Sequence, residues 1–453
     1  MATKVVDKLT VAASPPADGG VLPLTFFDVP WIFTGPVERV FLYTYPHAVE
    51  HLAAHLLPSL ASSLSAALHR FYPLLGRVRP CSSGGGGGGY EFCSTGGDAD
   101  RVELTVAESG DDFEELAGGG PMDVRRLYSL VPRLPRPEEG SSELAAVQVT
   151  VFPGKGLAVG VSIHHVACDD SSFMHFVKTW AANCRVASGG DVDAVPPPPP
   201  PFLDRGVVAD PDGLAAKTLD QMRQLANSGP PPPPPSGPPP KLFMASFTLT
   251  RDSIDKLKQR VTASGGGGVH CSAFTVACAY AWTCLARVDA TSAARERAHL
   301  LFSVECRRRL TPPVPQEYLG NCLRPCFVEV DTAGLLGSGA DGVVTAAVAI
   351  GAAIRGLDDG VLDGADGWFQ KIVSLMPHRP MSIGGSPRYG VYDTDFGLGR
   401  PAKVELLSID KTPGTVSMAE ARDGHGGIEI GVALPEADMA RFSSCFADGL
   451  KQL

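Results

Sequence analysis

Two histidines followed by two aspartates form the stretch of the sequence with the clearest chemical potential. His164 and His165 end an apolar, β-branched segment, and Asp169 and Asp170 follow shortly after. A neutral imidazole, with a pKa of roughly 6.5, can accept a proton near neutral pH and so serve as a general base. We therefore predict a catalytic centre at this junction, with His165 and Asp169 as its candidate residues.

The flanking segments predict how these residues are positioned. The run from Leu157 to His164 is apolar and rich in valine, which is typical of a buried strand. After the aspartates, apolar residues recur at helical spacing, namely Phe173, Phe176, Val177 and Trp180. Either aspartate can act as the N-cap of this helix, because a short carboxylate accepts unpaired backbone donors. A strand end holds a side chain firmly and leaves it reachable, as general-base catalysis requires.

Other interpretations of the same residues stay open. A lone histidine is more often a packed core residue than a catalyst, although the strand-to-helix junction favours catalysis here. A metal bound by His165 and Asp169 would lack a third ligand at local spacing, so we predict no metal site. Cys168 could be a nucleophile by residue type, but nothing nearby in the sequence lowers its pKa.

The composition indicates a globular chain with more than one core. Its 453 residues exceed the size at which a single hydrophobic core keeps growing, so two domains are expected. Lys plus Arg number 39 against 49 acids, which gives a formal net charge of −10. This balance argues against nucleic-acid or anionic-membrane binding, which needs clustered positive charge. A local basic pocket for a small anionic ligand is compatible with it.

The cysteines and the N-terminus bear on the compartment. The 11 cysteines are an odd number and include no Cys-x-x-Cys pair, so free thiols in a reducing compartment fit better than a disulfide framework. Residues 1–8 carry charges and no apolar signal region. No apolar run approaches the roughly 20 residues of a spanning helix. These features predict a cytoplasmic protein without a membrane segment.

The order of elements along the chain predicts a two-domain α/β architecture. An N-terminal domain is expected at 1–185, a proline-rich crossover linker at 186–240 and a C-terminal domain at 241–453. Apolar residues at three- and four-residue steps predict a helix over 57–71, and the almost wholly apolar stretch 269–285 predicts a buried one. Further helices are expected at 214–225, 253–261, 342–355 and 435–447, and strands at 241–250, 300–306, 325–330, 403–409 and 427–433.

A second suspicious stretch runs from Asp395 to Pro401 and reads Asp-Phe-Gly-Leu-Gly-Arg-Pro. Asp-Phe-Gly occurs in the metal-binding segment of protein kinases. The companion glycine-rich loop, strand lysine and His-Arg-Asp loop are absent from this sequence, which excludes a kinase. Taken alone, the stretch could be a tight turn in which Gly397 and Gly399 adopt positive φ.

Together, the two motifs resemble those of a known family. His165-x-x-x-Asp169 and Asp395-Phe-Gly-Leu-Gly399 are similar to the paired signatures of the plant BAHD acyltransferases, which are acyl-CoA-dependent. Condensation domains and chloramphenicol acetyltransferases share the first signature. The resemblance extends over nearly the whole chain, through Leu22 to Asp28, Phe71 to Gly76, Pro201 to Arg205, Ala279 to Trp282, Ser303 to Arg307 and Gly427 to Gly431.

Two further stretches, Tyr318 to Cys322 and Gly385 to Tyr392, resemble motifs of the branch that acylates anthocyanin, flavonoid and phenolic glucosides. Many members of that branch use malonyl-CoA. Three departures affect the expected donor or acceptor preference. Leu398 stands where the family usually has tryptophan, Asp170 replaces a usual glycine, and Glu305 replaces a usual aspartate.

The resemblance implies a two-domain chloramphenicol-acetyltransferase-like fold with the active site at the domain interface. His165 would deprotonate the acceptor hydroxyl or amine as that atom attacks the acyl-CoA thioester, with no acyl-enzyme and no permanently bound cofactor. Asp169 would face away from the substrate and pair with an arginine of the second domain, for which Arg307 is the best candidate. Asp395 and Gly397 would shape the CoA channel. We weigh Asp395 as a turn-fixing residue against a second proton acceptor and favour the turn.

Other candidates concern binding. The CoA phosphates need cations and donors, for which the candidates are Lys258, Ser272, Arg307 and Arg388. Trp31 and Phe33 could stack on a flat phenolic acceptor, although core packing explains these rings equally well.

Three functions follow from these observations. The leading one is malonyl transfer from malonyl-CoA to the sugar hydroxyl of a phenolic or flavonoid glucoside. The second is hydroxycinnamoyl or benzoyl transfer to an alcohol or amine, and the third is a catalytically silent binding protein of the same fold. An arginine at the malonyl carboxylate would favour the first, and an apolar donor pocket the second. The resemblance implies a monomer.

Overall fold

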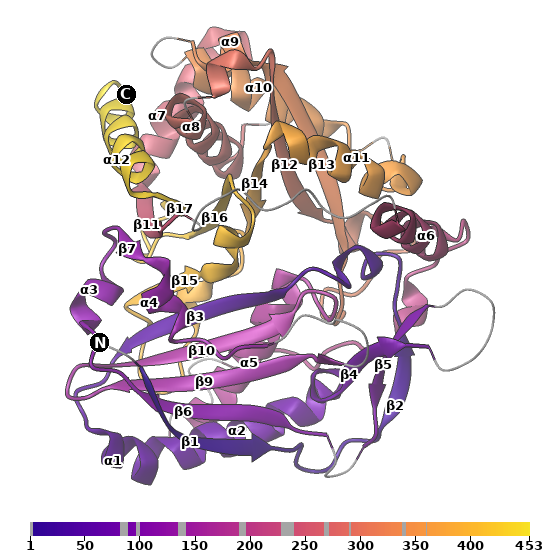
Figure 1. Ribbon diagram of the computed structural model, residues 1–453, viewed down its shortest axis with the longest axis vertical. Coiled ribbons are helices and arrows are strands. Elements are labelled where there is room, and N and C mark those ends of the chain that lie inside the picture. Colours follow the sequence, from indigo (N-terminus) through magenta and orange to yellow (C-terminus); the bar gives the residue numbers. More distant parts are fainter. Residues whose placement is uncertain are drawn as a thin grey trace.

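The computed structural model describes the chain apart from residues 1–2, 82–88, 97–99, 135–141, 190–195, 228–239, 267–270, 290, 338–340 and 359. Two layered units lie one above the other in Figure 1, the N-terminal half below and most of the C-terminal half above. Each unit is built on its own large sheet, with helices packed against it. The predicted two-domain α/β architecture is therefore confirmed.

The lower unit is organised around a mixed six-stranded sheet. In spatial order it contains β1 (Lys4–Val11), β6 (Val102–Glu108), β9 (Ala145–Phe152), β10 (Gly156–His164), β3 (Pro36–Thr44) and β15 (Lys403–Leu406). β10 lies between β9 and β3, and every one of its residues is buried, as its apolar sequence predicts. A smaller sheet beside it contains β2 (Gly20–Pro23), β5 (Tyr90–Ser94), β4 (Arg77–Pro80) and β8 (Ser142–Glu143).

Helices cover both faces of the lower sheet. α2 (Leu57–Arg70), which follows the short α1 (Val49–His51), and α5 (Asp170–Ala187) pack on the face that carries Phe41 and Val161. The short helices α3 (Phe113–Ala117) and α4 (Val124–Tyr128) pack on the other face, against Val40 and Leu42. Each large apolar side chain buried in this way contributes about 1.5–3 kcal/mol, so β10 and the residues at its end are held firmly.

The upper unit has a seven-stranded sheet. Its spatial order is β13 (Leu323–Asp331), β12 (Arg297–Glu305), β14 (Met381–Gly384), β16 (Thr415–Glu420), β17 (Ile428–Pro435), β11 (Leu242–Leu249) and β7 (Met122–Asp123). The helices of this half are α7 (Arg251–Val261), α8 (Ala273–Val288), α9 (Thr332–Leu335), α10 (Asp341–Arg355), α11 (Trp368–Leu375) and α12 (Glu436–Lys451). α8 is buried on nearly all sides, as its apolar sequence predicts.

Each large sheet takes one strand from the other half of the chain. β15 belongs to the C-terminal half in sequence but pairs with β3 in the lower sheet. β7 belongs to the N-terminal half but pairs with β11 in the upper sheet. The boundaries expected at 185 and 241 therefore separate two stretches of chain, whereas the spatial units exchange these strands.

The expected crossover contains α6 (Leu214–Asn227), which confirms the helix predicted at 214–225. Phe202, near the start of the crossover, forms an isolated bridge with Tyr318. Residues 190–195 and 228–239 of this crossover lie outside the described residues.

Two findings concern the chain as a whole. All 11 cysteines are free, as predicted. Among the residues that the structure describes, no helix combines the length and the apolar character needed to cross a bilayer.

Candidate active site

The site begins where β10 ends. His164 is the last residue of the strand, and its side chain is buried. His165 follows and is partly exposed. The first turn of α5 then starts behind it, with Asp169 as N-cap accepting the backbone N–H of Ser172 at 3.0 Å. The strand, the accessible histidine and the helix are therefore arranged as the sequence predicts.

Asn321 fixes the orientation and the tautomer of the His165 ring. Its side-chain Nδ2 donates to the Asp28 carboxylate at 3.0 Å and to the His165 carbonyl at 2.8 Å. Both partners are acceptors, so the amide nitrogen must face them and Oδ1 must face the imidazole. That oxygen lies 3.1 Å from His165 Nδ1, which must then carry the proton. The lone pair of Nε2 is left free to accept a proton from a substrate.

Behind Asn321 lies a buried carboxylate–guanidinium pair. Asp28 is fully buried, and its Oδ2 accepts from Arg205 Nη1 at 2.6 Å. Oδ2 also accepts from the backbone N–H and the hydroxyl of Thr25, while Oδ1 accepts the backbone N–H of Asn321. A buried carboxylate with this many donors is fully satisfied, so the amide of Asn321 is held in a rigid setting.

One face of the His165 imidazole is covered by Trp31. The two rings are stacked, with centroids 3.7 Å apart and planes within 4°. Burial lowers the pKa of His165 below its ordinary value, although hydrogen bonds and the charges of Asp169 and Asp170 oppose this. The ring is therefore neutral near neutral pH, which is the state a general base needs.

Asp169 joins the two halves of the molecule. Its carboxylate accepts two hydrogen bonds from Arg307, at 2.8 Å and 3.1 Å, and both side chains are fully buried. It also accepts the backbone N–H of Cys322 at 3.0 Å. The ion pair that the family resemblance implies between Asp169 and Arg307 is present.

Both terminal nitrogens of Arg307 donate hydrogen bonds to other groups of the protein. Besides Asp169, Nη2 donates to the carbonyls of Tyr318 and Gly320 and to the hydroxyl of Ser172. Glu305, the residue that departs from the family pattern, accepts from Arg307 at both its backbone N–H and Nη1. Arg307 is therefore placed as a buried link between the halves, and of the four candidates for CoA it is the one without exposed surface.

The second signature lies far from His165. Gly397 packs against Arg185 and Ser188, at the C-terminal end of α5. Fifteen residues separate Arg185 from Asp170, which at 1.5 Å per residue corresponds to about 22 Å along the helix. Asp395 Oδ1 accepts the backbone N–H groups of Gly397 and Gly399, each at 2.8 Å. Both glycines have positive φ, 89° and 79°, so the loop is a turn closed by its own carboxylate.

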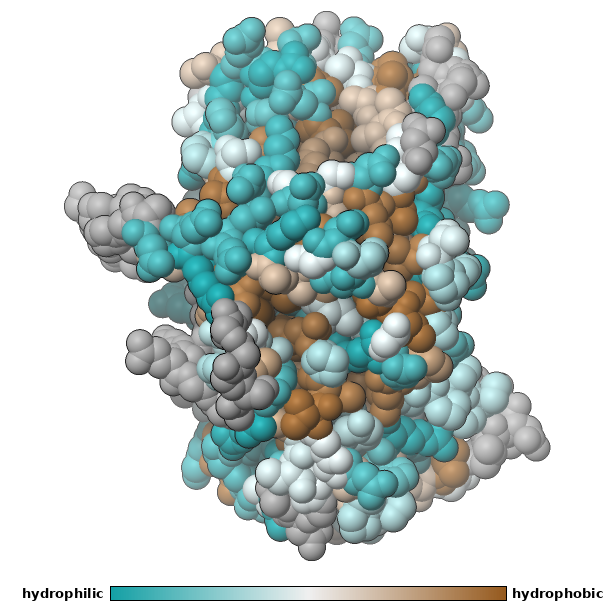
Figure 2. Space-filling model, turned by 90° about the vertical axis from the view of Figure 1, so that its right-hand side faces the viewer, coloured by the Kyte–Doolittle hydropathy of each residue, from teal (hydrophilic) through white to brown (hydrophobic). Residues whose placement is uncertain are grey.

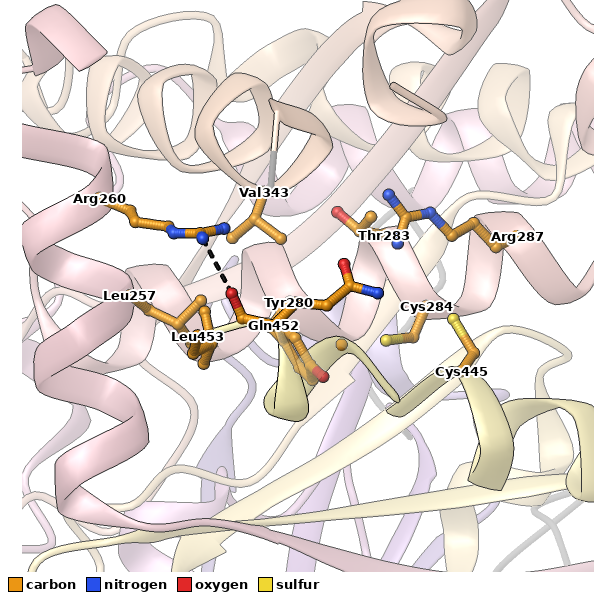
Figure 3. A pocket seen from close by; sticks show the side chains of 11 residues that line it. Leu257, Arg260, Tyr280, Thr283, Cys284, Arg287, Val343, Cys445, Gln452 and Leu453 are labelled. Carbon is orange, nitrogen blue, oxygen red and sulfur yellow. Dashed lines mark hydrogen bonds between the residues drawn. The ribbon is translucent and has the colours of Figure 1, made fainter. Parts of the chain in front are cut away.

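Two of the remaining CoA candidates belong to helices of the upper unit, and the third lies in the segment after β14. Lys258 is on α7, and Ser272 is the N-cap of α8. Burial raises the pKa of the Cys271 thiol and the charge of Lys258 opposes this, so Lys258 lies near Cys271 and its neighbour Ser272. Arg388 is exposed in the segment after β14. None of them lines the pocket of Figure 3, whose lining comes from α7, α8, α10 and α12 and includes Arg260, Cys284 and Cys445.

The two acceptor candidates differ in their surroundings. Trp31 is partly buried against His165, whereas the Phe33 side chain is 50% exposed and meets Tyr90 edge to face. Figure 2 shows the side of the molecule that carries α6 and α11 in Figure 1. Apolar side chains gather there near mid-height, where the two units meet.

Three residues of this site were not among the sequence-predicted candidates. Asp28, Arg205 and Asn321 hold His165, and each lies in or ends a stretch quoted for the family resemblance. Those stretches are far apart in sequence, and no spacing rule relates them. The available signal was that each stretch places a polar residue beside apolar ones, which is typical of a buried polar network.

Comparison with known proteins gives the family. The model of a family described as the Transferase family matches residues 1–448. A malonyl-CoA:anthocyanidin 5-O-glucoside-6''-O-malonyltransferase of Arabidopsis thaliana is 36% identical over 97% of this chain and 97% of its own. A coumaroyl-CoA:anthocyanidin 3-O-glucoside-6''-O-coumaroyltransferase of the same plant is 35% identical over 95% and 94%.

Solved structures agree with this in fold. Vinorine synthase superimposes with a TM-score of 0.67 at 20% identity, covering 97% of this chain and 96% of its own. A condensation domain of the calcium-dependent antibiotic synthetase reaches 0.59 at 14% identity, covering 96% and 97%. The fold is thus of the chloramphenicol-acetyltransferase-like type. On the two motifs, the family match and the relatives that span its length, the chain belongs to the BAHD acyltransferase family.

Proposed function

We propose that this protein transfers an acyl group from acyl-CoA to a sugar hydroxyl of a phenolic or flavonoid glucoside, with His165 as general base. The observation that carries the proposal is the contact of Asn321 Oδ1 with His165 Nδ1, which leaves Nε2 as the proton acceptor. A free lone pair on an accessible neutral histidine is what a general base requires.

The reaction follows from these positions. Nε2 of His165 takes the proton of the acceptor hydroxyl while the oxygen attacks the thioester carbonyl. The tetrahedral intermediate then expels the CoA sulfur as the C–S bond breaks, and His165 returns its proton to the thiolate. Trp31 keeps water from one face of the imidazole and holds the ring plane. Acyl-CoA is a co-substrate, and no residue needs to carry the acyl group.

The other site residues take supporting parts in this proposal. Asp169 holds the loop after His165 by pairing with Arg307 across the two units. Asp395, at the far end of α5, fixes the turn that includes Gly397. Lys258, Ser272 and Arg388 are the candidates for the CoA phosphates that have surface exposure or a helix N-terminus. Trp31 and Phe33 are the candidates for the acceptor ring.

Malonyl-CoA is the proposed donor, because relatives whose names specify malonyl transfer match nearly the whole chain at up to 36% identity. Coumaroyl-CoA is a second candidate on an equally specific observation, since a coumaroyltransferase matches at 35%. Both hypotheses share the glucoside acceptor and differ in whether the acyl group carries a charge.

The test is turnover by the purified protein with malonyl-CoA and, separately, with p-coumaroyl-CoA, against a panel of phenolic glucosides and amines. Malonylated glucoside that is absent with His165→Ala supports the proposal. Turnover with p-coumaroyl-CoA alone would assign the second donor. An absence of turnover with every CoA donor, together with measurable binding, would instead favour a silent binding protein.

We further propose that the protein acts as a monomer in the cytoplasm. Eleven free cysteines suit a reducing compartment, and a single chain supplies every residue described around His165. Light scattering after size exclusion and localisation of a fluorescent fusion would test these two points.

A further inference from the structure

Asp170 has a partner of its own. Its carboxylate accepts from Arg39 at Nη1, 2.7 Å, and at Nη2, 3.1 Å, in a bidentate arrangement. The Arg39 side chain is 3% exposed and that of Asp170 is 16% exposed. Such a geometry is the strongest form of an Arg–carboxylate contact, and it is little screened by water.

The location of Arg39 explains why it needs an anion. On β3, Arg39 alternates with Val40 and so lies on the sheet face of Phe41 and Tyr43, which α5 covers. Its guanidinium therefore meets the first turn of α5, where the helix dipole is positive. It also lies over the ring of Phe173, at 5.3 Å. In the described part of the chain, Asp170 is the one side chain that hydrogen-bonds to Arg39.

Two consecutive carboxylates thus form ion pairs with different units of the molecule. Asp169 is held by Arg307 of the upper unit, and Asp170 is held by Arg39 of the lower sheet. Between them and β10 lies the short loop that starts with His165. We infer that Asp170 is a positioning residue for His165, which together with Arg39 braces the start of α5 against β3 and balances the charge beside the imidazole. This inference rests on the proposed role of His165 as base.

The charges around His165 set the expected readout. The charges of Asp169, the N-cap of α5, and of Asp170, its first residue, act on the imidazole, and Arg307 and Glu305 lie beyond Asp169. The neutral Asn321 faces it from the segment before β13, with the Asp28–Arg205 pair behind. Trp31 covers one side. Because Asp170 and Arg39 neutralise each other, removing either charge uncovers the other one near the imidazole.

The experiment titrates His165 by NMR of histidine-labelled protein, with His165→Gln to assign its signal. Asp170→Asn leaves the Arg39 charge and should lower the pKa of His165 by about half a unit, whereas Arg39→Gln leaves the Asp170 charge and should raise it by a similar amount. The double variant should return the pKa to within about 0.2 of the parent while kcat stays about 10-fold low, because the brace is lost. KM values should change less than about threefold.

A second ion pair serves as the matched control. Arg126 holds Asp111 through two contacts, 2.9 Å and 2.7 Å, with side chains 26% and 13% exposed. The neighbouring Phe113 lies against Gly156 at the opposite end of β10, about 26 Å from His164 at ~3.3 Å per residue. Asp111→Asn and Arg126→Gln should change thermal unfolding but neither the pKa of His165 nor kcat.

Several outcomes would overturn the inference: a pKa of His165 that shifts in the same direction in both single variants, or parent-like kcat and pKa in both. If Asp170→Asn does not fold, Arg39→Lys tests the inference in its place, because it keeps the positive charge and loses the bidentate contact. It must then lower kcat with the pKa unmoved. The titration needs no turnover, so an inactive parent protein would refute the proposed function and leave this test in force.

Discussion

The two signature aspartates lie at opposite ends of α5 and in opposite settings. Asp169 is buried at the N-terminus of the helix and binds Arg307 and the Cys322 amide, residues of the other half of the chain. Asp395 lies at the C-terminal end on a partly exposed loop, and it accepts hydrogen bonds from two amides of that same loop. One carboxylate therefore fastens two units together, and the other shapes a single turn.

This difference shows that a motif aspartate is interpreted by what it binds. Removing an aspartate from an exposed loop costs little free energy. Removing one from a buried ion pair costs much more, because the partner's charge stays buried and is no longer compensated. The two ends of α5 should therefore respond very differently to equivalent substitutions. Four variants, taken from the largest expected effect to the smallest, sharpen the contrast.

His165→Ala should remove the base and lower kcat by about 10³-fold, within the range of 10²–10⁴ that a positioned general base supplies. The residue is partly exposed, so the unfolding temperature should change little. Steady-state kinetics with the preferred acyl-CoA and glucoside, alongside thermal unfolding, measure both. A kcat within tenfold of the parent would mean that another group accepts the proton.

Asp169→Asn should be the most destabilising change at this end of α5. It removes the buried counter-charge of the Arg307 guanidinium and leaves the partly exposed Glu305 as its carboxylate partner. Breaking a buried ion pair in this way costs about 3–5 kcal/mol. Urea unfolding measures the free energy, and kcat should fall with it because the His165 loop loosens. Glu103→Gln, which breaks the exposed pair with Lys8, is the control and should cost under about 1 kcal/mol. Equal losses in the two variants would contradict the assigned difference.

Asn321→Leu should lower kcat by about 10- to 100-fold, less than loss of the base, because the imidazole remains but its tautomer is no longer imposed. Asp28 also loses an amide donor. The matched change is Asn227→Leu, at the end of α6 and exposed, which should be neutral. NMR of the His165 ring nitrogens would show mixed tautomers in Asn321→Leu, and a single unchanged tautomer would refute the assignment.

The sequence predicts the strands and helices that carry this site better than it predicts how they pair in space. Periodicity and apolar runs give β10, α5 and α8, because burial on one or both faces leaves a local pattern. The exchange of β7 and β15 between sheets leaves no such pattern, since a two- or four-residue strand carries too few positions to define a face.

The candidate residues divide in the same way. His165 and Asp169 are found from their place between strand and helix, which is local information. Asn321, Asp28 and Arg205 act through contacts between residues more than 100 positions apart, such as the 293 between Asp28 and Asn321. Only the fold brings these residues together. The partner of Asp170 also lies more than 100 positions away in sequence, at a separation of 131.

Asp395→Ala should have the smallest effect of the four. The substitution removes two hydrogen bonds to a carboxylate on a partly exposed loop, so a loss of about 1–2 kcal/mol in unfolding free energy is expected. The positive φ of Gly397 and Gly399 is available to glycine without that carboxylate, so the turn should still form. About 22 Å of helix separates this loop from Asp170, and kcat should stay within about threefold while KM for acyl-CoA rises more. Asp395→Asn keeps one acceptor oxygen, so it should restore most of the unfolding free energy and most of the affinity for acyl-CoA.

A fall in kcat as large as that of His165→Ala would instead make Asp395 a proton acceptor, which requires the two ends of α5 to act on one substrate.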